Sequence, residues 1–117
     1  MDQTLTDALD GTRMVYTYPE MGTVRVVFEA GQVGFDWLAG PLEGQTGQNF
    51  PYRARRVGED QFFVNWHEPE ARGLVTLHID FEGEKVCSAV FAGYATDEEQ
   101  ILFHEAAIDR VEASSRT

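Results

Sequence analysis

Two tyrosines, Tyr16 and Tyr18, stand two residues apart near the start of the sequence. In an extended strand, residues i and i+2 point to the same face, so both phenol hydroxyls would reach one place. There they could donate two parallel hydrogen bonds to a carboxylate or a phenolate. They could instead be ordinary strand residues whose hydroxyls reach the rim of the fold. The residues alone favour this second interpretation.

Glu68 is a second candidate for chemistry, because it follows the apolar Trp66 closely and precedes Pro69. A carboxyl group among apolar neighbours can have a raised pKa and then serve as a general acid or base. Pro69 biases Glu68 toward an extended backbone, which would fix the direction of its carboxylate. A solvated glutamate at the start of a turn is the alternative that the residues alone favour.

The three histidines, His67, His78 and His104, do not form a metal-binding motif. They are 11 and 26 residues apart, without the close spacing that helices and strands use to converge ligands on zinc. The single cysteine, Cys87, can form neither an internal disulfide nor a multi-cysteine metal site. We therefore expect no metal site and no cofactor.

Composition restricts the class of partner. The 117 residues include 9 Lys and Arg against 20 Asp and Glu, which gives a formal net charge of −11. Nucleic-acid affinity depends on basic residues that neutralise phosphates, and anionic membranes also attract basic segments, so neither is an expected partner. The N-terminal residues lack the basic and apolar regions of a secretory signal, so we expect a cytoplasmic protein.

Alternating apolar and polar residues predict strands at 14–18, 24–29, 33–38, 52–57, 61–67, 74–80 and 85–92. Residues 39–49 contain three glycines and a proline and are predicted to form a loop. Seven short strands separated by turn residues are typical of an all-β barrel or sandwich.

The C-terminal part of the sequence supports two interpretations. The run Thr96-Asp97-Glu98-Glu99 resembles a helix capping box, and apolar residues follow it at helical spacing, so the local pattern favours a helix over 97–113. The alternative is an eighth strand over 100–105 that would help to close a barrel. Eight strands form about the smallest up-and-down antiparallel barrel that can hold a small ligand. We expect an N-terminal arm at 1–10, one barrel domain at 11–112 and a tail at 113–117.

Every second residue of a barrel strand faces the interior, and the more apolar of the two possible sets is taken as the inward one. This set comprises Met14, Tyr16, Tyr18, Val24, Val26, Phe28, Phe62, Val64 and Trp66. Both tyrosine hydroxyls would then point into an apolar interior, where a phenol without a partner costs about 1–3 kcal/mol.

Four segments together resemble the phenolic acid decarboxylases and the related molybdenum-cofactor-biosynthesis protein F (MoaF-like) family, which are lipocalin-like (calycin) β-barrels. They are residues 14–18, the glycine-bracketed residues 40–45, residues 63–69 with 74–77, and residues 96–111. The order and nearly gap-free spacing of the segments carry the resemblance, which covers roughly residues 11–111. It favours a strand at 100–105, with only a short turn at 96–99.

The resemblance implies a cofactor-free reaction in which 4-hydroxycinnamic acids become vinylphenols. Tyr16 and Tyr18 would hold an oxygen-bearing end of the substrate, and Glu68 would be the catalytic acid or base. Gln45 stands where these enzymes have an arginine. A neutral amide can donate a hydrogen bond to a carboxylate, but it supplies neither the charge nor the two-pronged geometry of a guanidinium group.

We therefore predict that the protein binds a small aromatic or conjugated compound that is neutral or weakly anionic. Catalysis, if present, would be that of a cofactor-independent lyase or isomerase. The predicted ligand contacts are Gln45, Trp37, Phe62, Trp66, Val26, Phe28 and Val64. Two alternatives remain open: a non-catalytic lipocalin-like binder, and a barrel with a filled interior that serves as an oligomerisation module. A homodimer is likewise left open.

Overall fold

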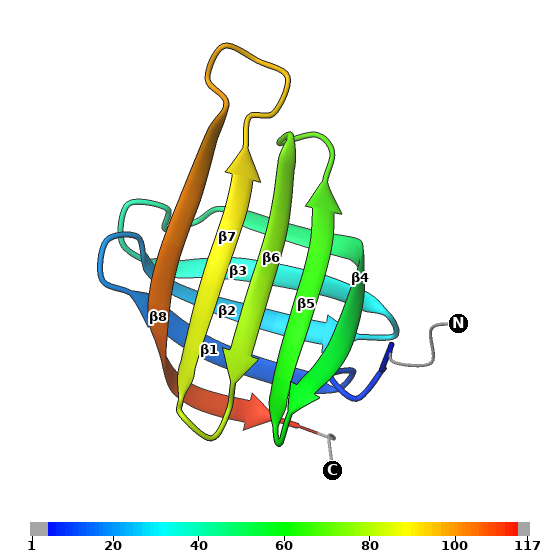
Figure 1. The fold of residues 1–117 in the computed structure, drawn as a ribbon. Coiled ribbons are helices and arrows are strands. Elements are labelled where there is room, and N and C mark those ends of the chain that lie inside the picture. The colour runs from blue at the N-terminus through cyan, green and yellow to red at the C-terminus, as the bar shows by residue number, and fades with distance from the viewer. Residues whose placement is uncertain (1–4, 115–117) are drawn as a thin grey trace.

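A computed structural model describes residues 5–114, which form a closed barrel of eight antiparallel strands joined in sequence order (Figure 1). The chain is therefore all-β with up-and-down topology, as its alternating pattern predicts. The strands are β1 (Thr12–Tyr18), β2 (Gly22–Glu29), β3 (Gln32–Ala39), β4 (Thr46–Gly58), β5 (Gln61–Glu68), β6 (Gly73–Asp80), β7 (Lys85–Ala92) and β8 (Gln100–Ala113). No helix among the described residues is long and apolar enough to cross a membrane.

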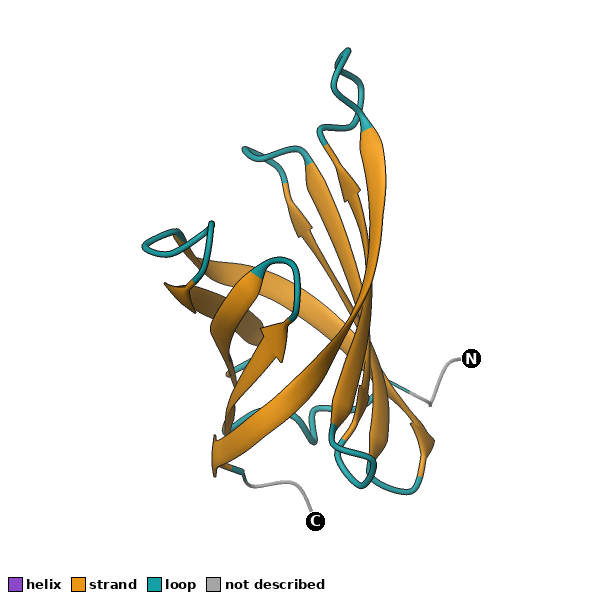
Figure 2. Cartoon of the chain, turned by 90° about the vertical axis from the view of Figure 1, so that its left-hand side faces the viewer, coloured by secondary structure: helices purple, strands orange, loops and turns teal. Residues whose placement is uncertain are grey.

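The barrel is much taller on one side than on the other. The strands β5 to β8 stand steeply across β1 to β3, and their upper ends project well beyond them (Figures 1 and 2). The pairing explains this shape, because β1 reaches β8 only between Thr17↔Ala107 and Arg13↔Ala113. The upper half of β8 pairs with β7 alone. The barrel consequently closes around its lower half and is open above.

Side chains fill the closed lower half of the barrel. Met14, Phe28, Phe62 and Val64 have no exposed surface, and the inward residues of β6 and β7 pack against them. This core is the inward set that the alternation predicts. Filling at this density excludes water and supplies most of the stabilisation, because each large apolar side chain contributes roughly 1.5–3 kcal/mol when buried.

The helix that the local pattern favours over 97–113 is wrong, and the strand that the resemblance favours at 100–105 is correct and longer than expected. β8 runs over 14 residues, from Gln100 to Ala113. Backbone pairing with β7 above and with β1 below outweighs the local helical pattern, and Ala106 enters the core. Helix propensity is a weak preference that such tertiary contacts override.

The predicted loop over 39–49 is too long, because β4 begins at Thr46. The start of this strand is irregular: the register with β3 shifts between Val33 and Phe35, and Asn49 has a φ of 67°. An irregular strand with glycine and asparagine lacks the clean alternation by which strands are recognised in a sequence.

The N-terminal segment closes the lower end of the barrel. Part of the arm predicted at 1–10 lies outside the described residues, but Leu5 makes an isolated bridge to Arg55, and Leu9 is completely buried in the core. Of the tail predicted at 113–117, Ala113 is the last residue of β8 and residues 115–117 lie outside the described part of the chain.

The burial of Leu9 predicts that Leu9→Ala lowers the free energy of unfolding by about 2–5 kcal/mol, because truncation leaves a cavity in the core. Leu5→Ala is the matched control: its side chain is 50% exposed, so a change within about 0.5 kcal/mol is expected. Denaturant unfolding measures both values. Equal losses for the two variants would show that Leu9 does not plug the barrel.

Candidate functional site

A cleft of about 740 Å³ opens at the upper end of the molecule, between the start of β4 and the turn that joins β5 to β6. Most of its wall comes from the irregular start of β4, and the opposite side comes from the end of β5. It is lined by Phe35, Gln45, Thr46, Gly47, Gln48, Asn49, Phe50, Pro51, His67, Glu68, Pro69, Glu70 and Ala71. The cleft therefore contains both Glu68 and Gln45, two residues that the sequence analysis singled out.

Glu68 ends β5 with its side chain half-buried at the cleft. Burial raises the pKa of its carboxyl group above the ordinary value, because loss of water disfavours the charged form. Two neighbours act in the opposite direction: Trp66 Nε1 donates a hydrogen bond of 2.7 Å to Glu68 Oε2, and His67 lies nearby. The net shift is upward, as predicted for an acid or base.

Gln45 is held at the base of the loop between β3 and β4. Trp37 N donates to Gln45 O at 2.9 Å, and Gly44 N donates to Trp37 O at 3.0 Å, so the loop is closed by backbone bonds to β3. The Gln45 side chain is exposed at the mouth of the cleft that also contains Glu68. The structure thus brings a neutral amide and a desolvated carboxyl group to one site.

Two phenylalanines that the sequence analysis did not select form the apolar part of the cleft. Phe35 and Phe50 stack with ring centroids 6.1 Å apart and an interplanar angle of 12°. A Cβ atom on Gly47 would lie 2.7 Å from both rings, so only glycine leaves them room. Phe35 alternates with Val33 and Trp37 and could have been selected on that ground, whereas Phe50 follows directly on the predicted loop.

Tyr16 and Tyr18 lie inside the closed barrel and do not line the cleft. Their rings meet edge to face at 5.6 Å, and Tyr18 stacks on Trp37 at 6.2 Å. The Tyr16 hydroxyl is hydrogen-bonded to Tyr18, which is also hydrogen-bonded to Ser88. Burial raises the pKa of both phenols, so they stay neutral. Protein partners therefore satisfy the two hydroxyls.

The remaining predicted contacts are also in the core. Val26, Phe28, Phe62 and Val64 are buried and do not line the cleft, and Trp66 reaches the site only through its hydrogen bond to Glu68. Their contact with a ligand stays a prediction. The cleft thus lies above the packed interior whose residues the alternation selected.

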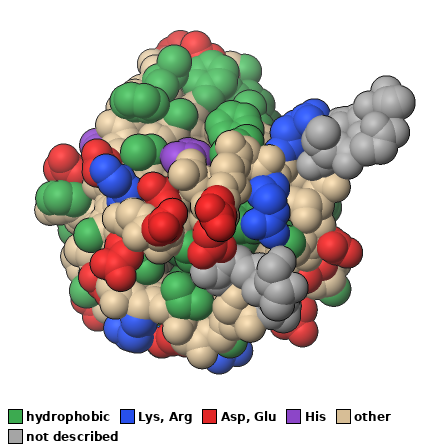
Figure 3. All heavy atoms as spheres, turned by 60° about the horizontal axis from the view of Figure 1, so that its bottom comes forward, with side chains coloured by type: hydrophobic (Ala, Val, Ile, Leu, Met, Phe, Trp, Pro, Cys, Tyr) green, Lys and Arg blue, Asp and Glu red, His purple; other side chains and the backbone are tan. Residues whose placement is uncertain are grey.

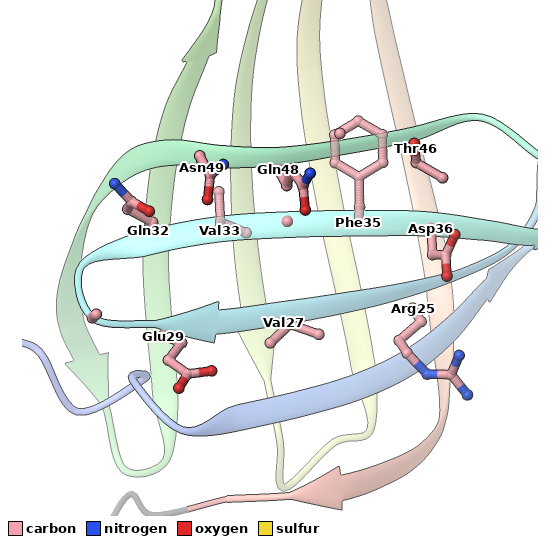
Figure 4. Close-up of a pocket in the computed structure, with 13 residues that line it drawn as sticks. Arg25, Val27, Glu29, Gln32, Val33, Phe35, Asp36, Thr46, Gln48 and Asn49 are labelled. Carbon is pink, nitrogen blue, oxygen red and sulfur yellow. The ribbon is translucent and has the colours of Figure 1, made fainter.

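A second hollow, of about 690 Å³, lies on the outer surface over β2, β3 and the start of β4 (Figure 4). Its rim is polar, with Arg25, Glu29 and Asp36 among the labelled side chains. Arg25 is already engaged, because its guanidinium donates to both carboxylate oxygens of Glu112 at 2.8 and 3.1 Å. The one basic side chain that lines this hollow is therefore engaged in an ion pair that ties β2 to β8.

The histidines lie apart, each with its own polar neighbour. His67 is hydrogen-bonded to Tyr94, His78 Nε2 lies 3.1 Å from Gln61 Oε1, and His104 Nδ1 lies 3.4 Å from Glu20 Oε1. Within residues 5–114, no group of three or more His, Cys, Asp or Glu side chains is placed to hold a metal ion.

Comparison with known proteins identifies the fold but no family. No protein-family model matches the sequence, and no curated protein matches it. The structure is similar to a solved protein described as a putative beta-lactamase from Burkholderia vietnamiensis, with a TM-score of 0.75 and 17% sequence identity. The similarity covers 88% of this chain and 94% of that one. At this identity it shows a shared barrel fold alone.

The surroundings of Glu68 predict that its carboxyl group titrates above the ordinary glutamate pKa of 4.5. NMR titration of the side-chain carbonyl carbon measures this directly. Trp66→Phe removes the hydrogen bond that favours the carboxylate, so the pKa should rise further in that variant. A wild-type pKa at or below 4.5, or a lower value in Trp66→Phe, would contradict the assignment.

The same shift predicts a pH dependence of stability. Because the pKa of Glu68 is higher in the folded state, this group contributes most below its unfolded pKa and loses that contribution as pH rises through its folded pKa. Glu68→Gln cannot titrate, so the wild type should lose stability relative to this variant as pH rises through that window. Denaturant unfolding across pH tests this: the free energy of unfolding of the wild type minus that of Glu68→Gln should fall as pH rises, and a value that stays constant or increases would refute the prediction.

Proposed function

We propose that the protein binds a small aromatic or conjugated molecule, neutral or at most weakly anionic, in the cleft between β4 and the β5–β6 turn. One observation carries this proposal: a desolvated carboxyl group, Glu68, faces the same cleft as a stacked aromatic pair, Phe35 and Phe50. Apolar walls with a few placed polar groups are the usual composition of a small-molecule site. Gln45 supplies a second polar group at the mouth.

Charge supports the preference for a neutral ligand. The cleft is lined by two glutamates, Glu68 and Glu70, and by no lysine or arginine. The whole chain carries a formal net charge of −11, so an anion would enter against the field without a local cation to offset it. Gln45 can donate a hydrogen bond to an oxygen but cannot neutralise a carboxylate.

If the protein is also an enzyme, the cleft favours cofactor-free acid and base chemistry of the lyase or isomerase class. In a decarboxylation of a 4-hydroxycinnamic acid, Glu68 would donate its proton to the side-chain carbon while the phenol gives its proton to water, which leaves a quinone methide. The bond to the carboxylate would then break and release CO₂, and its electron pair would return through the ring to the phenol oxygen. That oxygen takes up a proton from water to give the vinylphenol, and water also reprotonates Glu68. A raised pKa suits Glu68 to this task, because burial keeps the neutral, proton-donating form of the carboxyl group to higher pH than in an exposed glutamate. This chemistry rests on the resemblance to the phenolic acid decarboxylases and the MoaF-like calycins.

Two observations weigh on the alternatives. Tyr16 and Tyr18, which the resemblance assigns to substrate, are engaged with each other and with Ser88, which favours a binding role for the cleft over decarboxylation. Hydrolysis of a lactam by a covalent route needs an activated nucleophile. The lining of the cleft contains no serine or cysteine, and its one hydroxyl side chain is that of the exposed Thr46. A non-catalytic ligand-binding protein is therefore the second candidate.

Three probes test the proposal: 4-vinylphenol, p-coumarate and ferulate, each titrated into the labelled protein and followed by amide NMR. We expect the amides of Gln45, Gln48 and Glu68 to shift, with tighter binding of the neutral 4-vinylphenol than of the two anions. Glu68→Gln should tighten binding of the anions by removing a like charge. Glu59→Gln, in the turn at the other end of β5, is the matched control and should change nothing.

The two parts of the proposal can fail separately. If none of the three probes shifts the cleft amides at millimolar concentration, the cleft does not bind compounds of this class. Incubation with p-coumarate or ferulate and chromatography for the vinylphenol then tests the chemistry. Product formed equally by the wild type and by Glu68→Gln would remove Glu68 from catalysis, and no product from either would leave only the binding role.

A further inference from the structure

The upper half of β8 is a free sheet edge. β7 pairs with β8 from Gln100 to Ala107, whereas β1 pairs with it only from Ala107 to Ala113. Residues 100–106 therefore have a strand on one side and, within the described chain, none on the other. Figure 1 shows this part of β8 rising along the edge of the sheet, with β7 beside it on one side.

This edge lacks the devices that usually protect a free strand. Exposed edges are normally blocked by lysine, by proline, by a bulge or by a covering loop, because their backbone groups are a template for another strand. Residues 100–106 contain no lysine, arginine or proline, and Glu105 is their single charged residue. The register with β7 runs through them without a shift, so the strand is regular.

The side chains on the outer face of this edge are the most exposed large hydrophobic residues in the described chain. Ile101 is 72% exposed and Phe103 is 78% exposed. Phe91 on β7 and Leu74 on β6 pair in one row with Ile101 and are also exposed. Figure 3, in which the outer face of β5–β8 lies toward the top, shows hydrophobic side chains gathered there. The edge is thus continuous with an apolar sheet face.

We propose that a second copy of this chain occupies the edge, with the two β8 strands pairing antiparallel about a two-fold axis into one sheet that continues from barrel to barrel. Identical strands can meet in this way because an antiparallel pair about a two-fold axis is self-complementary. Main-chain hydrogen bonds supply the affinity of such strand addition, and the side chains supply its specificity.

The side chains select the register. Residues directly opposite one another in an antiparallel pair share a face, so the axis must pass through a residue. An axis at Leu102 places Ile101 opposite the partner's Phe103 and Gln100 opposite the partner's His104. An axis at Phe103 would place Ile101 opposite the partner's Glu105, setting a carboxylate against an apolar residue. The first register pairs apolar with apolar and polar with polar, so it is the one we infer.

The negative charge of the chain works against a contact between two copies, so the proposed dimer should depend on ionic strength. Two copies with a net charge of −11 each repel one another over most of their surfaces. In the inferred register residues 100–104 contain no carboxylate, whereas Glu105 lies opposite the partner's Glu99, which directly precedes β8, so one like-charge pair flanks each end of the contact. Added salt screens the general repulsion, so the dimer should tighten as ionic strength rises. An interface built on ion pairs would weaken instead.

Light scattering and sedimentation of the full chain over a range of concentrations test the proposal. We expect a mass of twice 13.2 kDa at high protein concentration, with dissociation on dilution. Ile101→Lys and Phe103→Lys introduce the residue that natural edges use for protection and should each give a monomer. Their side chains are exposed, so circular dichroism and thermal melting should remain those of the wild type.

Two matched controls separate the edge from the sheet face. Leu74→Lys lies on the same outer face but away from the edge, and Val57→Lys lies on β4; both residues are exposed, and both variants should remain dimeric. A wild type that is monomeric at every concentration overturns the proposal. A dimer that Leu74→Lys dissociates and Phe103→Lys does not would place the contact on the face and overturn the strand pairing.

Cysteine cross-linking tests the register in a Cys87→Ser background. Leu102→Cys brings its two sulfur atoms together at the two-fold axis and should give a disulfide-linked dimer on mild oxidation. Phe103→Cys would face the partner's Ile101 and should link more slowly. Faster linking through position 103 than through position 102 would contradict the inferred register.

Discussion

The molecule depends on the unequal pairing of β8 with its two neighbours. Its lower half, from Ala107 to Ala113, pairs with β1, which closes the barrel and allows side chains to fill the interior. Its upper half pairs with β7 alone, so the upper ends of β5–β8 stand free of β1–β3. A closed barrel has no edges, and a partly closed one exposes both an edge and an open mouth. The cleft and the free strand both lie in this open part.

The sequence predicts the closed part of the fold well, because a strand with one buried face alternates strictly. The first three strands and β5–β7 follow this rule, and Met14 and Phe62 occupy the interior as expected. The prediction fails at two places. At the start of β4, an irregular register with β3 breaks the alternation, so the local pattern indicated a loop. Along β8, the strand pairs first with β7 and then with β1, and the local pattern, which does not report these distant partners, indicated a helix.

The sequence points to the polar residues of the cleft, but it does not show that the cleft lies above a packed interior. Apolar neighbours and a following proline identify Glu68, and the structure raises its pKa through burial. Gln45 shares its cleft, although 23 positions separate them in the sequence. Alternation gave the tyrosines and the core residues as ligand contacts, yet it reports only which face is inward. Whether an inward face lines a cavity or a packed core depends on where the barrel closes. In this structure the predicted residues lie in the packed core, and Phe35 and Phe50 line the cleft.

The central claim is that ligands enter the open cleft above a filled barrel and do not occupy the interior. Intermolecular nuclear Overhauser effects between 4-vinylphenol and the labelled protein test this claim most directly. The account predicts contacts from the ligand ring to Phe35 and Phe50. Contacts to Phe28 and Phe62 in place of these would put the ligand in the closed half and contradict the account.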